Sequence, residues 1–159
     1  MNVTIRPAII SDSNAIMKLI KELALFEKEP DSAILKEADI RAYGFGKVPL
    51  FECLVAEVEI QVIGMALFYP RFSTWKGPTF HLEDLIVSEN YKGKGYGTQL
   101  YSAFISHAHK KGVQRIEWNV LDWNTPAVNF YEKSGANVLQ DWCNVQMDAE
   151  AMENYLKKH

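Results

Sequence analysis

Hydrophobic and polar residues recur along the chain with two periods, one typical of helices and one typical of strands. After Asp12, which can cap a helix, apolar residues from Ile16 to Leu25 recur at helical spacing. In the first half of the chain the pattern predicts a strand closed by Pro7, the helix after Asp12, a helix at 35–43, and strands at 51–58 and 61–69 joined by a hairpin turn. A loop at 70–78, a strand at 80–87 and a helix to about Lys111 follow. The remaining elements predicted are a strand at 115–121, a helix ending before Gly135, a strand at 138–147 and a helix at 150–158.

The order of these elements predicts an α/β fold. Strands dominate early, and strands and helices alternate later, which favours a mixed, mostly antiparallel sheet with helices on both faces. No repeat, low-complexity tract or linker divides the 159 residues, so we expect one domain over residues 1–159. An apolar content of 48% and a charged content of 23% are ordinary for a globular protein.

Charge and cysteine usage exclude several classes of protein. The formal net charge is −3 and no basic block stands out, which argues against a nucleic-acid partner. Residues 1–6 contain no long apolar run, so we expect neither a signal peptide nor a membrane anchor. Cys53 and Cys143 are isolated thiols without Cys-x-x-Cys spacing, which favours a reduced, cytoplasmic setting.

Three alternate glycines lie in segment 92–98, between the expected strand at 80–87 and a helical pattern. Glycines allow a tight turn whose N–H groups point into one concavity at a helix N-terminus, which suits a phosphate or pyrophosphate. A Walker A loop would need a lysine before Thr98, and a dinucleotide fingerprint would need the third glycine one residue later. A turn without a ligand explains one glycine, but not three that alternate with Lys92 and Lys94.

Histidine and cysteine spacing does not indicate a metal site. His81-Leu82-Glu83 resembles the His-x-Glu of zinc deaminases, but no Cys-x-x-Cys follows. His107 and His109 are two residues apart on a helix and cannot chelate from one face. Neither cysteine lies in a positively charged motif, so a thiol nucleophile is not expected either.

Residues 92–97 and 124–136 together resemble the GCN5-related N-acetyltransferase (GNAT) superfamily. The first block matches Arg/Gln-x-x-Gly-x-Gly/Ala except at Lys92, where the charge is kept without the forked geometry of arginine, so a slightly different pyrophosphate contact is expected. The block at 124–136 is similar to Asn-x-x-Ala-x-x-Phe-Tyr-x-x-x-Gly. The resemblance extends to the diamine acetyltransferase branch, which includes the spermidine/spermine and thialysine enzymes, through segments 5–8, 19–24, 44–46, 53–57 and 82–84, with 73–77 and 121–124 closer to the thialysine type.

This resemblance implies transfer of an acetyl group from acetyl-CoA to a primary amine of a small diamine or lysine-like amino acid. The amine attacks directly in a ternary complex, Glu83 takes its proton through water, and Tyr131 acts as the acid at the coenzyme A sulfur. The implied acetyl-CoA contacts are the backbone of Leu85, Ile86 and Val87 for pantetheine; Lys92, Gly93, Lys94, Gly95, Tyr96, Gly97 and Thr98 for pyrophosphate; and Asn124, Thr125, Pro126, Ala127 and Tyr131 for the pantetheine arm or adenosine side.

Substrate contacts are expected on several segments. The resemblance places Phe26 and Glu27 in the substrate loop, where Glu27 would hold the distal cation of a dicationic amine. Asp84 points away from Glu83 in a regular strand and becomes a second substrate contact if a bulge rotates it inward. Further candidates are Trp75 as a cation–π face, and Glu117 and Asn119, which share one face of a strand.

Two other functions fit the same residues. One is an acetyltransferase for peptide or protein amines, and the other is a non-catalytic sensor that binds acyl-CoA. The resemblance also implies a homodimer.

Overall fold

The computed structural model describes residues 2–158, which form two compact units divided between Asn119 and Val120. The first unit contains a sheet in the order β1-β2-β3-β4-β5, with β1 (Thr4–Pro7), β2 (Glu52–Val58), β3 (Gln61–Ser73), β4 (Gly77–Val87) and β5 (Ile116–Glu117). All neighbours are antiparallel except β4 and β5, which are parallel. The mixed, mostly antiparallel sheet predicted from the sequence is confirmed.

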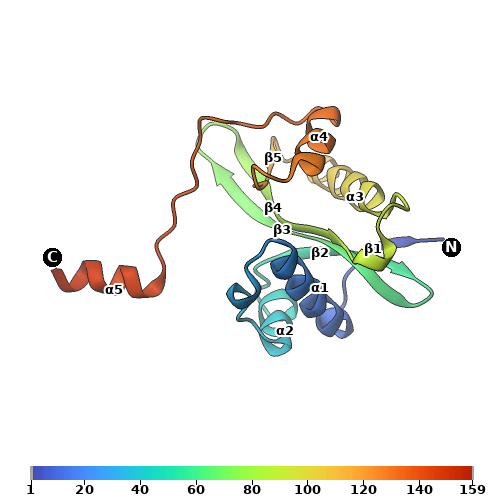
Figure 1. Ribbon diagram of the computed structural model, residues 1–159, viewed down its shortest axis with the longest axis horizontal. Helices are drawn as coiled ribbons and strands as arrows, with labels where there is room; N and C mark the ends of the chain where they lie inside the picture. The colour runs from blue at the N-terminus through green and yellow to red at the C-terminus, as the bar shows by residue number, and fades with distance from the viewer. Residues whose placement is uncertain (1, 159) are drawn as a thin grey trace. The chain divides into compact units, whose positions relative to one another are not determined.

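Helices cover both faces of this sheet (Figure 1). Helices α1 (Ser13–Phe26) and α2 (Glu37–Phe45) pack on one face, and α3 (Tyr96–Lys110) packs on the other. Short 3-10 turns lie at Ile10–Asp12, Pro30–Ser32 and Glu89–Tyr91. The core under α3 contains Leu100, Phe104 and Phe68, and the core under α1 contains Ile16, Val55 and Met65.

The loop predicted at 70–78 is wrong, because β3 and β4 continue as a long hairpin to a turn between Ser73 and Gly77. Pro70 pairs with Phe80 inside this hairpin. The pairing of β2 with β3 ends at Phe68. Pro70 lacks an N–H, but no hydrogen bond to β2 is lost, because β2 does not reach this position.

Two other predictions for this unit fail. The strand expected at 115–121 is only Ile116–Glu117. Asp12 occupies the N-cap position of α1, but its side chain makes no capping hydrogen bond, because its carboxylate accepts hydrogen bonds from Arg6 and from the N–H of Ile9. The guanidinium and that N–H occupy the carboxylate, and the 3-10 turn at Ile10–Asp12 starts the helical segment instead.

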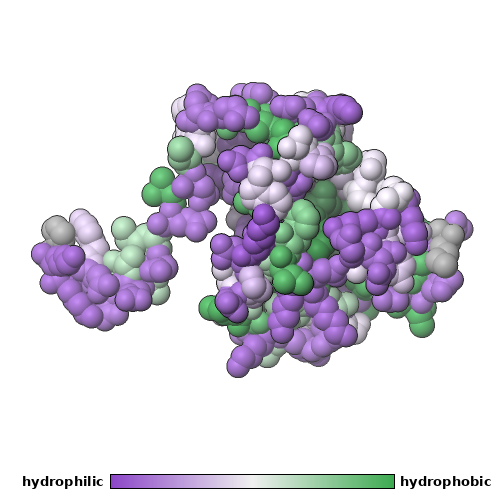
Figure 2. Space-filling model, viewed as in Figure 1, coloured by the Kyte–Doolittle hydropathy of each residue, from purple (hydrophilic) through white to green (hydrophobic). Residues whose placement is uncertain are grey.

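The second unit contains α4 (Thr125–Lys133) and α5 (Ala149–Lys158). Asn124 caps α4 by accepting from the N–H of Ala127, and Gly135 follows it at φ +95°. The strand predicted at 138–147 is wrong, because within the described part of this unit no strand offers it a ladder of hydrogen bonds. The terminal helix is confirmed, with a hydrophilic side and a paler hydrophobic side in Figure 2. No helix among the described residues is long and apolar enough to cross a membrane.

Candidate active site

A β-bulge at Glu83 reorients the end of β4. Leu82 pairs with Phe68 and Asp84 pairs with Leu67, so Glu83 is an extra residue without a partner on β3. Leu82 points into the core under α3, whereas Ile86 points into the core under α1. Asp84 lies two residues before Ile86 and so shares the α1 side of the sheet. The bulge that would turn Asp84 inward is therefore present.

Three carboxylates gather on this side, at the C-terminal end of α1. Burial and the negative charges of Glu83 and Glu27 raise the pKa of Asp84 to about 7. Partial desolvation and the charge of Glu83 raise the pKa of Glu27. Glu27 is also the C-cap of α1, where the helix dipole is negative. Crowded negative charges at a helix C-terminus favour the binding of a cation.

Tyr69 and His81 lie next to Glu83, and Tyr69 holds its carboxylate in place. The hydroxyl of Tyr69 donates a 2.9 Å hydrogen bond to Oε2 of Glu83. His81 Nε2 lies 3.7 Å from the same oxygen, and the His81 ring lies against the ring of Tyr69 with centroids 5.3 Å apart. Burial and the hydrogen bond to Glu83 raise the pKa of Tyr69 to about 12, so Tyr69 remains a donor at neutral pH.

Three other expected substrate contacts lie in the first unit outside the acidic cluster, and one of them, Glu117, faces His81. Glu117 forms ion pairs with Arg71 and, at 2.9 Å, with Arg115, so its carboxylate already has cationic partners within the chain. Trp75 is 81% exposed in the turn of the β3–β4 hairpin, at least four residues or about 13 Å along the strand from His81. Asn119 is exposed beyond the end of β5.

The outer edge of β4 is open beside the bulge. Pairing with β5 involves only Phe80 with Ile116 and His81 with Glu117. Past this point, no strand of residues 2–158 lies against residues 82–87 on that side. An open edge of extended backbone can accept an extended ligand through its peptide groups.

The register of the β3–β4 ladder determines which peptide groups face this edge. The N–H of Ser88 donates to the carbonyl of Ile63, and hydrogen-bonded pairs alternate along an antiparallel ladder. The N–H and C=O of Ile86 therefore face β3, whereas those of Leu85 and Val87 face the open edge. Of the three residues expected to bind pantetheine, Leu85 and Val87 present free peptide groups.

The glycine loop leads from β4 into α3. Gly93 and Gly95 have φ of +76° and +79°, a region that side chains disfavour, and Gly95 is the N-cap of α3. The first helical hydrogen bond joins the N–H of Gln99 to the carbonyl of Gly95. The N–H groups of Gly97 and Thr98 precede it, so they lie at the positive end of the helix without an intrahelical acceptor. This is the anion-binding geometry that the sequence predicts.

The same loop contacts α1. Glu22 accepts a 2.7 Å hydrogen bond from the N–H of Glu89, and the ammonium of Lys92 lies 4.9 Å from the centroid of the Phe26 ring. Lys92 also pairs with Glu89, and Lys94 lies over the ring of Tyr91. Phe26 thus contacts the glycine loop and precedes the acidic Glu27.

The remaining predicted residues belong to the second unit. Asn124 accepts from the N–H of Ala127, and Thr125 and Pro126 form the first turn of α4. The Tyr131 ring lies edge-to-face with Phe130, centroids 5.5 Å apart, and its carbonyl accepts from the hydroxyl of Ser134. Tyr131 thus lies on α4 beside Phe130, and its role at the coenzyme A sulfur stays a prediction.

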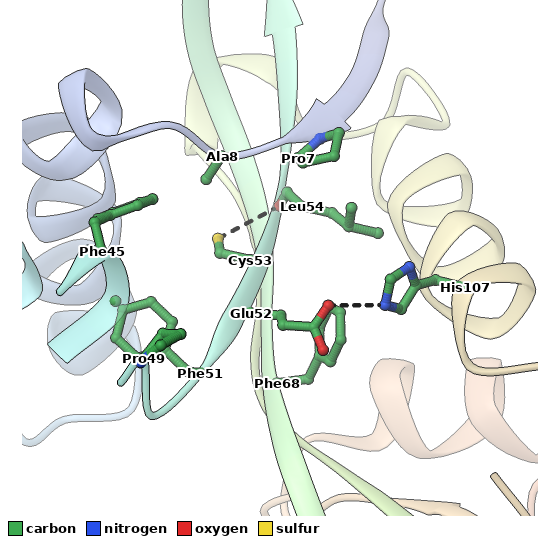
Figure 3. Close-up of a pocket in the computed structure, with 11 residues that line it drawn as sticks. Pro7, Ala8, Phe45, Pro49, Phe51, Glu52, Cys53, Leu54, Phe68 and His107 are labelled. Atoms are coloured by element: carbon green, nitrogen blue, oxygen red, sulfur yellow. Dashed lines mark hydrogen bonds and ion pairs between the residues drawn. The ribbon is translucent and has the colours of Figure 1, made fainter. Parts of the chain in front are cut away.

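A cavity of about 240 Å³ lies at the other edge of the sheet, where β1 leaves β2 (Figure 3). Its lining includes Phe45, Phe51 and the pair formed by Glu52 with His107. None of the residues expected to take part in acetyl transfer lines it. The acidic cluster and the open edge of β4 are therefore separate from this cavity.

Sequence reasoning missed two residues, Tyr69 and His81. Tyr69 lies twelve positions before His81, and only the hairpin register pairs them. In the sequence, His81 stands out only as part of a zinc-like motif. A continuous hairpin through residues 70–78 would have brought both next to Glu83.

Comparison with known proteins identifies the fold and the family of this chain. A solved structure, an integron cassette protein from the mobile metagenome of V. cholerae, has the same fold, with a TM-score of 0.80, 23% identity and 99% coverage of both chains. The profile of the "Acetyltransferase (GNAT) family" matches residues 15–136. The chain therefore belongs to the GNAT acetyltransferase family.

Two curated relatives lie in the diamine acetyltransferase branch. The thialysine N-epsilon-acetyltransferase of Mus musculus is 41% identical over 159 residues, covering 93% of this chain and 94% of its own. The spermidine/spermine N(1)-acetyltransferase-like protein 1 of Homo sapiens is 35% identical, covering 83% of this chain and 20% of its own. The predicted resemblance to this branch is confirmed.

Proposed function

We propose that this protein is an acetyl-CoA-dependent N-acetyltransferase for a small amine that carries a second cationic or polar group, of the thialysine or diamine type. The observation that carries the proposal is the cluster of Glu27, Glu83 and Asp84 beside the open edge of β4. Burial first, and the neighbouring negative charges second, raise the pKa of Glu27 and of Asp84 there, and a bound cation would relieve the second of these effects.

Residues of the first unit fit acetyl-CoA. Bare N–H groups at the start of α3 suit its pyrophosphate, and the peptide groups of Leu85 and Val87 suit the amides of its pantetheine arm. A Cβ at Gly97 would meet Val87 at 3.8 Å, an ordinary contact, so the packing of the chain does not require a glycine there. The bare backbone at Gly97 is thus available to a ligand. When bound, acetyl-CoA supplies an activated acetyl group and a thiolate leaving group.

The chain's own residues supply the rest of the chemistry. A primary amine at neutral pH is mostly an ammonium ion, and only its free lone pair can attack. Glu83 is half exposed and held by Tyr69, so it is placed to accept the ammonium proton, directly or through one water. Asp84 and Glu27 hold the second cationic group. Tyr131 protonates the departing sulfur.

We also propose that residues 1–159 act as one domain and that the protein works in the cytoplasm as a homodimer. The family profile crosses the boundary between the two units, which supports a single domain. Exposed apolar side chains on a segment without a partner strand support self-association. They are Leu139, Trp142 and Val145. Light scattering of the purified chain tests this assembly.

The test is an acetyl-transfer screen read by release of free thiol. Thialysine, lysine, ornithine, putrescine, spermidine and an aminoglycoside are offered with acetyl-CoA, alongside a lysine-containing peptide. We expect the small dicationic or lysine-like amines to react, and Glu83→Gln to lower kcat about a hundredfold or more. Glu150→Gln, an exposed carboxylate on α5, is the matched control. Preference for the peptide would favour a protein acetyltransferase, and acetyl-CoA binding without turnover would favour a sensor.

A further inference from the structure

His81 lies between two carboxylates in the active site. Its side chain is only 12% exposed, its Nε2 lies 3.7 Å from Glu83 Oε2, and its Nδ1 lies 3.8 Å from Glu117 Oε1. Nδ1 is buried and makes no hydrogen bond within the described chain. The role proposed above for Glu83 does not use this imidazole.

Glu117 determines which ring nitrogen carries the proton. Its carboxylate is fixed by Arg71 and Arg115, so it cannot turn away from His81. A lone pair on Nδ1 would face that carboxylate, whereas an N–H there would be attracted to it. Glu83 is half exposed and already accepts a hydrogen bond from Tyr69, whereas Glu117 is held by two arginines against the buried Nδ1. The proton of the neutral ring is therefore assigned to Nδ1, and Nε2 presents a lone pair toward Glu83.

The imidazole is neutral at rest. Burial lowers the pKa of His81, the charge of Glu83 opposes this effect, and the cation of Arg71 reinforces it. Glu117 also faces the ring, and its carboxylate is ion-paired with two arginines. The titratable and charged groups around the ring are Glu83 on β4, Tyr69 and Arg71 on β3, and Glu117 with its partner Arg115 at β5.

Amine acetylation has a proton balance that needs such a group. An ammonium nitrogen carries three protons and the product amide nitrogen carries one. Of the two protons released, one ends on the thiol of the released donor and the other leaves for solvent. An imidazole is intrinsically a stronger base than a carboxylate, so it is the better acceptor for a proton that an amine releases.

We propose that His81 is a positioning residue that receives this second proton from Glu83. The proton passes from the ammonium nitrogen to Glu83, directly or through water, and then to the Nε2 lone pair of His81. Glu83 is thereby restored as a carboxylate, and the imidazolium is stabilised between Glu83 and Glu117 until the proton leaves for solvent. A small rotation of the half-exposed Glu83 side chain, by about 1 Å at its oxygen, brings Oε2 within hydrogen-bond distance of Nε2. The proposal rests on the acetyltransferase function proposed above.

The first test observes the ring nitrogens by long-range ¹H–¹⁵N NMR in the full chain without substrate. His81→Gln identifies the His81 signals among those of the four histidines. We expect a neutral Nδ1–H ring at pH 7 and a shift toward the Nε2–H form in Glu117→Gln. An Nε2–H ring in the wild-type protein overturns the proposal, because Nε2 could then not accept a proton from Glu83.

The second test measures the pH dependence of kcat. In His81→Gln we expect kcat to fall about tenfold to a hundredfold while KM changes less than about twofold, because the residue acts on the proton and not on the bound amine. The acidic limb of the kcat profile that reports the imidazole should disappear, and added imidazole should restore part of the rate. His109→Gln, on the exposed face of α3, is the matched control. An unchanged kcat and pH profile in His81→Gln overturns the relay.

Failure of the proposed acetyltransferase function and failure of the His81 relay give different experimental results. If the wild-type protein transfers acetyl to no amine, the relay falls together with the proposed function. If the wild-type protein is active and His81→Gln matches it in kcat and pH profile, the relay alone is overturned and Glu83 returns its proton directly to water.

Discussion

The hydroxyl of Tyr69 donates a 2.9 Å hydrogen bond to Oε2 of Glu83 across the β3–β4 hairpin. Tyr69 pairs with His81 in the ladder. In a regular ladder the residue two positions after His81 would be only a diagonal neighbour of Tyr69. The bulge leaves Glu83 without a partner on β3 and lets its carboxylate reach the tyrosine. The hydrogen bond thus connects the irregularity of the strand to the position of the proposed base.

We predict that Tyr69→Phe lowers kcat/KM about tenfold, because a hydrogen bond to a charged group contributes roughly 1.5–3 kcal/mol and this one is partly exposed. The fold should be unaffected, since the rest of the ring remains. Steady-state kinetics with the best amine from the screen, together with thermal unfolding, measure both effects. Tyr43→Phe, on the exposed side of α2, should behave like the wild-type protein.

A second prediction concerns stability and pH. Asp84 has a folded-state pKa of about 7, above its ordinary 3.8, so between about pH 4 and pH 7 the folded protein keeps a proton that the unfolded chain has lost. The stabilisation that comes from the raised pKa of Asp84 is therefore fully present below pH 4. It declines as the pH rises to 7 and levels off above 7. Asp84→Asn should remove this decline and exceed the wild-type free energy of unfolding at pH 8 by at most about 4 kcal/mol.

Urea unfolding at pH 5 and pH 8 measures this difference. Asp31→Asn, at an exposed aspartate, controls for the loss of one charge. A gain in Asp84→Asn that is the same at both pH values would contradict the raised pKa of Asp84.

A third prediction follows from the same cluster. A dicationic amine that binds beside Asp84 and Glu27 lowers the pKa of both groups, so binding near pH 6.5 should release protons. Calorimetry in two buffers with different ionisation enthalpies measures the number released. We expect up to about one proton per amine in the wild-type protein and less than half of that in Asp84→Asn. Equal proton release by both proteins would remove Asp84 from the binding site.

A fourth prediction compares the two ends of α3. Gly95 and Gly112 have φ of +79° and +73°, and an added Cβ meets nothing within 4 Å at either position. Each alanine substitution should therefore destabilise the protein by about 1–2 kcal/mol through backbone strain alone. Only Gly95→Ala should also weaken acetyl-CoA binding, because Gly95 shapes the N-terminal loop. Equal acetyl-CoA dissociation constants for the two variants would show that the glycine loop does not hold the pyrophosphate.

A fifth prediction tests the acid. Tyr131→Phe should lower kcat by about a hundredfold and leave the acetyl-CoA dissociation constant within about threefold of the wild-type value, because the hydroxyl acts on the departing sulfur. Rapid-quench kinetics and equilibrium binding measure the two quantities. Equal losses in both would show that Tyr131 binds acetyl-CoA and does not act as an acid.

Local patterns in the sequence determined most of the elements of this protein. The helical spacing after Asp12, the strand-like apolar run at 51–58 and the glycines at 93 and 95 each depend on neighbours a few residues apart, so they predict α1, β2 and the glycine loop. The family motifs at 92–97 and 124–136 are local as well. Glu83 and Glu27 could therefore be identified as site candidates before their contacts were known.

Only the tertiary structure decided how these residues meet. The bulge at Glu83 depends on the register between two strands, and the approach of Glu27 to Asp84 depends on how α1 packs on the sheet. The placement of His81 between Glu83 and Glu117 requires the pairing of β4 with β5. These are long-range contacts, and their free energy comes from desolvation and charge at distances of a few ångströms, which the order of residues along the chain does not encode locally.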